Sequence, residues 1–286
     1  MKGLVLAGGR GTRLHPLTVA TCKQLLPVYD KPMIYYPIAT LMAAGIREIL
    51  LITNPEDSII FENLLGTGRE LGVEFSYAVQ EKPEGIGQAF IIGERFINGN
   101  DSALILGDNI FHGSGLGREL AKHQNISGAH IFGYEVSNPS EYGVLEISKT
   151  GIVLSVEEKP ISPKSNLAIP GLYFYDSEVS MIAKSIKPSA RGELEITEIN
   201  NQYMLNGKLN ATVLPRGTAW FDMGTFDSLQ DAGNYVRILE QRQNLRISCL
   251  EEIAWRQNWI NNSDLERLID RNKNTNLGLY LMGLIR

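Results

Sequence analysis

The chain begins with the stretch that decides its fold, Lys2-Gly3-Leu4-Val5-Leu6-Ala7-Gly8-Gly9-Arg10-Gly11-Thr12-Arg13-Leu14. The apolar run at 4–7 predicts a short buried strand, and this strand ends directly at glycines. Glycine lets backbone N–H groups approach an anion closely, and a concave run of such groups binds phosphate. Arg10 and Arg13 add cations that can pair with phosphate oxygens. The stretch predicts either a phosphate-binding loop at the carboxyl end of a strand or a plain turn between a strand and a helix.

Two familiar phosphate-binding motifs fit this stretch poorly. The P-loop motif requires a lysine directly after its last glycine, whereas Thr12 follows Gly11. The dinucleotide-binding motif requires G-x-G-x-x-G at the start of a helix. His15-Pro16 interrupts any such helix, because the residue before proline avoids the helical conformation. A hydride-transferring enzyme with a bound dinucleotide is therefore disfavoured.

The composition is that of a globular protein with a large core. The 286 residues are 43% hydrophobic, with a mean hydropathy of -0.09 and a net charge of -5. The negative charge gives no basic footprint for nucleic acid, and no run of about 18 apolar residues predicts a transmembrane helix. The N-terminus lacks the pattern of a signal peptide, so a cytoplasmic location is expected.

Cysteine and histidine spacings do not predict a metal site or a catalytic triad. Cys22 and Cys249 are far apart in the sequence, so free thiols are expected. The four histidines show neither metal-binding nor Ser-His-Asp spacing and are expected in loops or at the surface.

Strand and helix patterns alternate through the first part of the chain, which is typical of a largely parallel sheet flanked by helices. The expected strands are 4–7, 48–53, 73–79, 102–106 and 129–136, and the expected helices are 33–44, 59–65, 87–96 and 116–124. The carboxyl ends of such strands share one edge of the sheet, where ligands bind. Strands at 144–147, 153–157, 171–175 and 210–214 then mix with helices at 177–185 and 196–206, and helices at 226–244, 250–257 and 264–271 follow.

Several polar residues follow these elements at positions suited to phosphate or metal chemistry. Lys23 lies beyond the glycine-rich loop, where it either holds a triphosphate or is a solvated lysine. Gln80 and Gly85 follow the third strand; an amide can pair with a pyrimidine edge, although an ordinary loop would have the same sequence. Asp108 and Asp222 offer the oxygen ligands that Mg²⁺ prefers, and a turn-capping aspartate is the alternative for Asp108.

Longer motifs point to a known family. L-A-G-G-x-G-T-R-L at 6–14, followed by K-Q-L-L-P-V at 23–28, resembles the signature of the sugar-nucleotide pyrophosphorylases, the nucleotidyltransferases that act on sugar 1-phosphates. The sequence Y-D-K-P-M-I-Y-Y-P-I at 29–38 is similar to the thymidylyltransferase branch of this family. Further similar motifs are Y-G-V at 142–144, E-K-P at 158–160 and W-F-D-M-G-T at 220–225, in which Met223 replaces the usual threonine.

The resemblance implies the fold and the domain organisation. The expected fold is α/β, with a Rossmann-like, mixed, mostly parallel sheet flanked by helices and a C-terminal helical addition. A nucleotidyltransferase domain is expected at 1–225, with a nucleotide half at about 1–136 and a sugar half at about 137–225. The helical segment at 226–286 is expected to serve oligomerisation and regulation.

The resemblance also implies the reaction. A Mg²⁺-dependent in-line attack of glucose 1-phosphate on dTTP would give dTDP-glucose and pyrophosphate, the first step of dTDP-rhamnose or other deoxysugar synthesis. The implied catalytic residues are Arg13, Lys23, Asp108, Lys159 and Asp222, with Asp108 and Asp222 as metal ligands. The implied nucleotide-binding residues are Leu6, Gly8, Gly9, Gly11, Thr12, Arg13, Lys23, Gln24, Gln80, Pro83, Gly85 and Asp108.

The implied sugar-phosphate-binding residues are Asn109, Tyr142, Gly143, Glu158, Lys159, Ile169, Tyr173 and Arg191. Without the resemblance, Glu158-Lys159 would be interpreted as a surface ion pair, which contributes only about 0–1 kcal/mol. A homotetramer with feedback by dTDP-rhamnose is also implied, with Arg216, Cys249, Glu252 and Ile253 as regulatory residues.

Two alternatives remain open. One is the same fold acting on UTP, another nucleotide or another sugar phosphate. The other is a non-catalytic, nucleotide-sensing regulatory subunit. The presence of Arg13, Lys23, Asp108 and Asp222 disfavours the second alternative, because such subunits tend to lose a metal carboxylate or the arginine of the loop.

Overall fold

The computed structural model describes residues 1–9 and 11–285, so Arg10 lies outside the described residues. Four strands form a parallel half of the sheet: β1 (Lys2–Ala7), β4 (Glu48–Thr53), β5 (Glu74–Val79) and β6 (Ser102–Leu106). Strand β1 is buried on both faces, because Val5 packs into one hydrophobic cluster and Leu4 into the other. The N-terminal stretch therefore forms a central strand, as its apolar run predicts.

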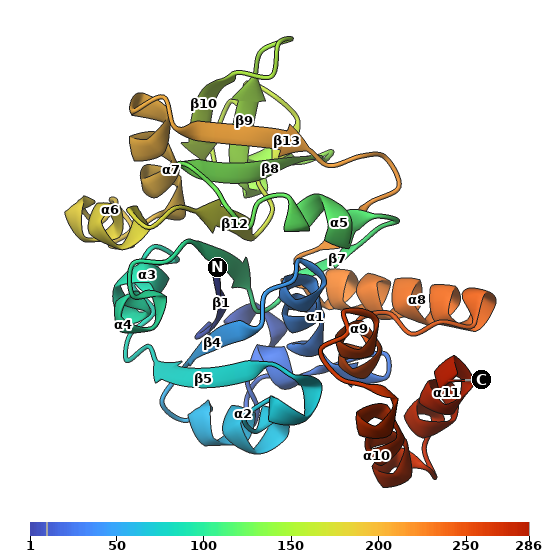
Figure 1. Ribbon diagram of the computed structural model, residues 1–286. Coiled ribbons are helices and arrows are strands. Elements are labelled where there is room, and N and C mark those ends of the chain that lie inside the picture. Colours follow the sequence, from blue (N-terminus) through green and yellow to red (C-terminus); the bar gives the residue numbers. More distant parts are fainter. Residues whose placement is uncertain (10, 286) are drawn as a thin grey trace.

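The rest of the sheet is the mixed half. Its strands are β8 (Ala129–Glu135), β9 (Gly143–Ile147), β10 (Val153–Glu158), β11 (Leu167–Ala168), β12 (Leu172–Tyr175) and β13 (Leu209–Val213). Strand β12 joins the halves by pairing antiparallel with both β6 and β8, and β13 runs parallel to β8. The described residues thus form one 10-stranded sheet in the order β10-β9-β11-β8-β12-β6-β1-β4-β5, with β13 beside β8 (Figure 1).

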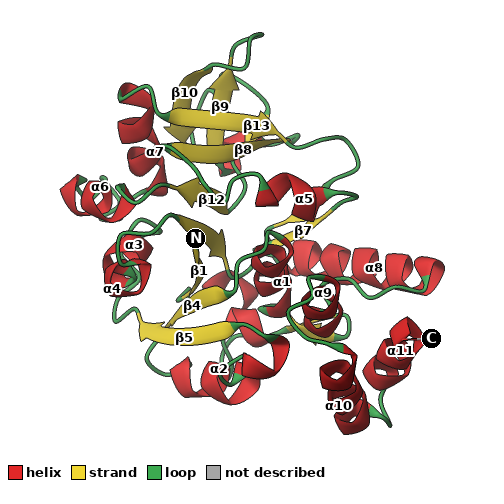
Figure 2. Ribbon diagram, in the orientation of Figure 1, coloured by secondary structure: helices red, strands yellow, loops and turns green. Residues whose placement is uncertain are grey.

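Helices flank this sheet, and the expected α/β fold is confirmed (Figure 2). In chain order they are α1 (Tyr35–Ala43), α2 (Ser58–Leu65), α3 (Gln88–Ile92), α4 (Glu94–Ile97), α5 (Leu116–Ala121), α6 (Val179–Ser185) and α7 (Ile196–Leu205). The helix expected at 87–96 is divided into α3 and α4 at Gly93. Glycine is a weak helix former, and a Cβ there would lie 2.7 Å from Cδ2 of Leu4.

Short elements between the main strands position the site. The turns η1 (Thr12–Leu14) and η2 (Lys23–Leu25) follow the glycine-rich loop, and the small strands β2 (Pro27–Val28) and β3 (Lys31–Pro32) pair with each other. Strands β7 (Ile110–His112) and β14 (Ala219–Phe221) pair antiparallel. This pairing brings the segment that contains Asp222 to the end of β6.

The C-terminal segment is helical: α8 (Phe226–Gln243), α9 (Leu250–Arg256), α10 (Asn262–Asn272) and α11 (Asn276–Ile285). Helix α11 is not anticipated by the sequence pattern. Helix α9 packs against α1, and α10 packs against α11, so this segment lies beside the parallel half (Figure 1). No helix in the described ranges combines the length and the apolar character needed to cross a membrane.

Two expectations about individual side chains have different outcomes. Cys22 and Cys249 are free and buried, as expected. The expectation that every histidine lies in a loop or at the surface is wrong for His130, which is only 9% exposed. His130 belongs to β8, and the neighbouring strands β12 and β13 enclose it from both sides.

Candidate active site

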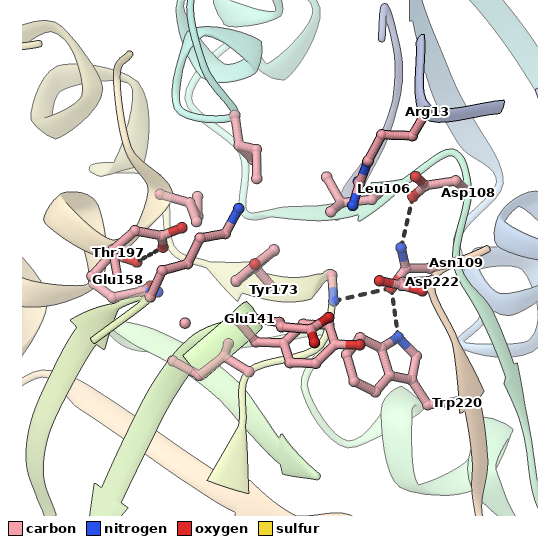
Figure 3. Close-up of a pocket in the computed structure, with 18 residues that line it drawn as sticks. Arg13, Leu106, Asp108, Asn109, Glu141, Glu158, Tyr173, Thr197, Trp220 and Asp222 are labelled. Carbon is pink, nitrogen blue, oxygen red and sulfur yellow. Dashed lines mark hydrogen bonds between the residues drawn. The ribbon is translucent and has the colours of Figure 1, made fainter. Parts of the chain in front are cut away.

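A cavity of about 470 Å³ lies between the carboxyl end of β6 and the mixed half of the sheet (Figure 3). Among its lining residues are ten of the predicted site residues: Arg13, Asp108, Asn109, Tyr142, Gly143, Glu158, Lys159, Ile169, Tyr173 and Asp222. These residues come from segments far apart in the sequence. The fold therefore brings both predicted carboxylates and two predicted cations to one cavity.

A partly buried ion pair lies at the end of β6. The Nζ atom of Lys23 lies 2.5 Å from Oδ2 of Asp108 and donates to the backbone carbonyl of Asp222 at 3.3 Å. The Lys23 side chain is 7% exposed and that of Asp108 is 25% exposed. Lys23 thereby connects the segments that carry the two predicted metal ligands.

Asn109 holds the other oxygen of Asp108. Its Oδ1 accepts hydrogen bonds from Nε1 of Trp220 at 2.6 Å and from the backbone N–H of Gly171 at 3.2 Å. Its Nδ2 donates to Oδ1 of Asp108 at 2.8 Å. Because both neighbours of Oδ1 are donors, the orientation of this buried amide is determined, and the amide fixes the Asp108 carboxylate in turn.

Asp222 follows β14 and precedes a residue with an unusual backbone conformation. Met223 has φ of 43° and is fully buried among residues such as Leu14 and Val236. A side chain at positive φ carries strain, which the apolar packing of Met223 offsets. The methionine that replaces the usual threonine thus faces the core and anchors the loop, while Asp222 lines the cavity.

The glycine-rich loop is shaped by its close neighbours. Gly11 has φ of 60°, and a Cβ there would lie 2.9 Å from Cβ of Lys23. A Cβ on Gly8 would lie 2.3 Å from Oε1 of Gln80. Gly11 is therefore favoured both by its backbone conformation and by its contact with Lys23, whereas the absence of a side chain at Gly8 leaves the space that Oε1 of Gln80 occupies.

The loop after β5 carries Gln80 and Gly85. Gln80 is 3% exposed, and Gly85 has φ of 107°. The backbone carbonyl of Glu84 accepts from the N–H of Leu194, and Gly87 N–H donates to the Leu194 carbonyl at 2.8 Å. These backbone bonds tie the predicted base-binding loop to the segment before α7.

Charged residues line the opposite side of the cavity. The Glu158 carboxylate accepts from Oγ1 of Thr197 at 2.7 Å and from Nη2 of Arg191 at 3.2 Å. Lys159 is exposed, has φ of 41°, and donates its backbone N–H to the Tyr142 carbonyl at 3.0 Å. Burial and then the charge of Asp222 raise the pKa of Tyr142 to about 12, so its hydroxyl stays protonated at neutral pH.

Of the twelve predicted nucleotide-binding residues, all of which the structure describes, Arg13 and Asp108 line this cavity and the other ten do not. Leu6 is half-buried, Gly9, Thr12 and Pro83 are exposed, and Gln24 is 4% exposed. Oε1 of Gln24 is a buried acceptor without a hydrogen-bond partner among the described residues.

Several lining residues are missing from the sequence-based site. They are Ile86, Leu106, Glu141, Gly171, Ile196, Thr197, Asn200 and Trp220. Only Trp220 had a signal, since it opens the motif that contains Asp222. Leu106 ends the predicted strand β6, and the others enter through loop and helix geometry that local sequence does not encode.

The predicted regulatory residues do not all come together. Ile253 lines a second cavity, of about 140 Å³, with Thr40, His112 and Ser248. Glu252 accepts from Nε of Arg256 at 2.7 Å and from the Tyr280 hydroxyl at 2.5 Å, and Cys249 is 3% exposed. Arg216 is exposed in the loop between β13 and β14 and lines neither cavity.

The donor set of the main cavity fits Mg²⁺. Asp108 and Asp222 supply carboxylate oxygens, and the described residues contain no cluster of three or more metal-ligating side chains. Mg²⁺ requires no such cluster, because it retains several waters and is bound by one or two carboxylates together with substrate phosphates.

Residues 2–237 match the nucleotidyl transferase family. The chain belongs to this family. It is 57% identical over 288 residues to a glucose-1-phosphate thymidylyltransferase of Mycobacterium tuberculosis, and the match covers 100% of this chain and 99% of that protein. The resemblance to the thymidylyltransferase branch is therefore confirmed.

Two solved structures have the same fold. The chain matches a Bacillus anthracis protein described as a glucose-1-phosphate thymidylyltransferase with a TM-score of 0.76 and 42% identity, over 83% of this chain and 95% of that one. It also matches a UDP-glucose pyrophosphorylase complexed with UDP-glucose, with a TM-score of 0.71 and 28% identity, over 84% of this chain and 99% of that one. Both neighbours of this nucleotidyl transferase are described as enzymes of sugar-nucleotide chemistry.

Proposed function

We propose that this chain is a glucose-1-phosphate thymidylyltransferase, which converts dTTP and glucose 1-phosphate to dTDP-glucose and pyrophosphate. The observation that carries the proposal is the Lys23–Asp108 pair at the end of β6, held at 2.5 Å beside the backbone of Asp222. It combines a preset cation for phosphate with two carboxylates for a divalent metal. The full-length identity to a named thymidylyltransferase supports the choice of reaction.

The nucleotide is assigned to the parallel half of the sheet. Backbone N–H groups of the loop at 8–12 and the side chains of Arg13 and Lys23 would bind the triphosphate. Gln80 and the backbone at Gly85 would bind the thymine edge, since an amide carries both a donor and an acceptor. Gln80 lies against Gly8, so base and phosphate recognition would occur on adjacent segments.

The sugar phosphate is assigned to the mixed half. Glu158 has two hydrogen-bond donors fixing it, Thr197 and Arg191, and can accept from sugar hydroxyls as well. Lys159 and Arg191 are the cations available for the sugar phosphate on this side of the cavity. Ile169 and Tyr173, both buried, would form an apolar wall for the sugar ring.

The reaction follows from these positions. A phosphate oxygen of glucose 1-phosphate forms a bond to the α-phosphorus of dTTP, while the bond from that phosphorus to the bridging oxygen breaks and pyrophosphate leaves. The nucleophile is already anionic, so no general base is needed. Arg13, Lys23 and Lys159 would offset the charge that develops, and Mg²⁺ held by Asp108 and Asp222 would neutralise phosphate charge when bound.

Assembly and feedback are assigned to the C-terminal helices. We propose a homotetramer with a second nucleotide site, regulated by dTDP-rhamnose, near Cys249, Glu252 and Ile253. Two cavities support this placement: Ile253 lines one of about 140 Å³ beside α1 and β7, and Glu252 lines a larger one of about 710 Å³ together with Arg256 and Tyr280. Light scattering on the purified protein measures the assembly, and a dimer or monomer would contradict the tetramer.

The decisive experiment measures pyrophosphate release with glucose 1-phosphate, Mg²⁺ and each of dTTP, UTP, CTP and ATP. Release with dTTP that stops on addition of EDTA is expected. Release with a different nucleotide alone would keep the mechanism and overturn the base assignment. Binding of dTTP without release for any nucleotide would favour the regulatory subunit.

A further inference from the structure

A chain of three polar side chains stands behind the proposed base site. Nε2 of Gln80 donates to Oε1 of Gln88 at 2.6 Å. Oε1 of Gln88 also accepts from the backbone N–H of Glu84 at 3.2 Å, and its Nε2 donates to Oε2 of Glu84 at 2.9 Å. The chain runs from the buried Gln80 to the exposed Glu84.

Glu84, at one end of this chain, determines the direction of every bond in it. The backbone N–H of Glu84 can only donate, so it requires the oxygen of Gln88. The Glu84 carboxylate can only accept, so it requires the nitrogen of Gln88. If the Gln88 amide were reversed, its nitrogen would face the backbone N–H of Glu84, and its oxygen would face the Glu84 carboxylate. Neither pair could form a hydrogen bond. The oxygen of Gln88 therefore accepts a hydrogen bond from Gln80, and the donor atom of Gln80 must be Nε2.

The consequence for Gln80 is that its carbonyl oxygen faces the glycine-rich loop. A Cβ on Gly8 would lie 2.3 Å from this oxygen, so Oε1 is turned toward the segment that cradles the nucleotide. At 3% exposure the Gln80 side chain has little freedom to rearrange. The base edge in this part of the site meets an acceptor.

Pyrimidine bases differ in what they present to an acceptor. Thymine and uracil carry a hydrogen on N3 and donate there, whereas N3 of cytosine is an acceptor. A fixed Oε1 of Gln80 favours thymine and uracil, which donate from N3. It disfavours cytosine, because two acceptors that face each other both stay unpaired.

We propose that Gln88 is a positioning residue that fixes the amide of Gln80 and thereby selects pyrimidine nucleotides with N3–H. This inference rests on the proposed role of Gln80 in base binding. Gln88 lies at the start of α3 and needs no contact with the nucleotide, since its effect passes through the orientation of its neighbour.

The test is the ratio of dissociation constants for dUTP and dCTP, measured by calorimetry on the full chain. These nucleotides differ only at the N3–C4 edge. Gln88→Met keeps the length of the side chain and removes its hydrogen bonds, so the Gln80 amide can rotate. We expect the ratio of the dCTP to the dUTP dissociation constant to fall about tenfold. This change corresponds to the free energy of about one hydrogen bond. The double variant Gln88→Glu/Glu84→Gln retains an acceptor for Nε2 of Gln80 and supplies an amide donor at position 84 for the new carboxylate, so it should retain most of the preference.

Gln202→Met is the matched control. Gln202 also donates to a glutamate four residues earlier, Glu198, at 3.0 Å, but it lies in α7 away from Gln80. We expect it to leave the preference unchanged. In turnover with dTTP, Gln88→Met should raise KM with kcat within about twofold, because only base binding is affected.

A double-mutant cycle separates positioning from a structural role. In a Gln80→Ala background, Gln88→Met should have no further effect on the preference. An unchanged preference in Gln88→Met, or an equal loss in the Gln80→Ala background, would overturn the proposal. Wild-type turnover with dTTP tests the proposed function separately, since the binding ratio is measured without turnover.

Discussion

Lys23 and Arg191, the cations that we assign to the nucleotide and to the sugar phosphate, differ in burial and in their partners. Neither lines the main cavity, but each pairs with a carboxylate that does: Lys23 with Asp108 and Arg191 with Glu158. The Lys23 side chain is 7% exposed and has one carboxylate partner, Asp108. The Arg191 side chain is 44% exposed and is shared among Glu158, Glu193 and Glu195. Charge interactions are stronger where water is excluded and weak at an exposed site. The proposed nucleotide side is therefore preorganised for charge development, and the proposed sugar side is adaptable.

The largest effect expected from this difference is at Lys23. Lys23→Met removes the buried cation that we assign to the triphosphate and keeps an apolar side chain of similar length. We expect kcat to fall by about 10²–10³, which is typical for the loss of one preorganised electrostatic group. Steady-state pyrophosphate release measures it.

The control for Lys23 is Lys184→Met, which removes a half-exposed lysine paired with Glu94 at 2.5 Å. It should leave kcat within about twofold. A thermal melt of Lys23→Met separates lost chemistry from lost folding. Turnover near the wild-type value in a folded Lys23→Met protein would remove the preorganised pair from the mechanism.

Asp108 is the next position. Asp108→Asn preserves the shape of the side chain and removes its charge. It therefore weakens both metal binding and the ion pair with Lys23. We expect kcat to fall by about 10² and the Mg²⁺ concentration for half-maximal rate to rise. A Mg²⁺ titration of the rate checks both.

The expected Mg²⁺ shift distinguishes a metal ligand from a simple partner of Lys23. If kcat falls and the Mg²⁺ dependence is unchanged, Asp108 acts only through Lys23. In that case Asp222→Asn should still shift the Mg²⁺ dependence.

The sequence predicts the longer strands of both halves to within two residues, and the strand of this sheet that it misses, β11, is missed for a physical reason. The strands at 48–53 and 102–106 have the predicted bounds, because a run of apolar residues buried on both faces is a local signal. Strand β11 has two residues and exists only through its pairing with β8 and β9, which local sequence does not contain.

The residues of the candidate site also differ in how far local sequence predicts them. Asp108 follows an apolar strand and could be recognised from its position. Thr197 and Glu141 line the cavity because of the way α7 and the loop before β9 pack. No spacing in the sequence predicts that these two residues belong to the site. Residues at strand ends can be predicted from sequence, and residues placed by tertiary contacts cannot.

The mixed half also carries a titratable core, which should make its stability depend on pH. His130 and His123 stack with ring centroids 3.9 Å apart, and Glu119 and Lys122 are the charged groups nearby. Burial and then His123 lower the pKa of His130 to about 4, from 6.5 in the unfolded chain. The unfolded state therefore binds more protons in this range, and stability is lost as pH falls from about 6.5 toward 4.

We expect the free energy of unfolding to fall less between pH 7 and pH 5 in the His130→Gln variant than in the wild type. The difference should be about 2 kcal/mol, since one pKa unit corresponds to about 1.4 kcal/mol. Urea unfolding at both pH values measures the difference. Equal pH dependence in the two proteins would show that His130 titrates normally in the folded state.

The smallest effect is expected at Arg191, the exposed counterpart of Lys23. Arg191→Gln removes a cation that water and its glutamate neighbours already screen, so we expect KM for glucose 1-phosphate to rise about three- to tenfold with kcat nearly constant. Arg191→Lys should recover part of this loss, because it keeps the charge and loses the forked geometry. Saturation curves in glucose 1-phosphate at fixed dTTP separate the two parameters. A fall in kcat as large as that of Lys23→Met would contradict the contrast between the two sides, because it would require the exposed arginine to stabilise the transition state as strongly as the buried lysine.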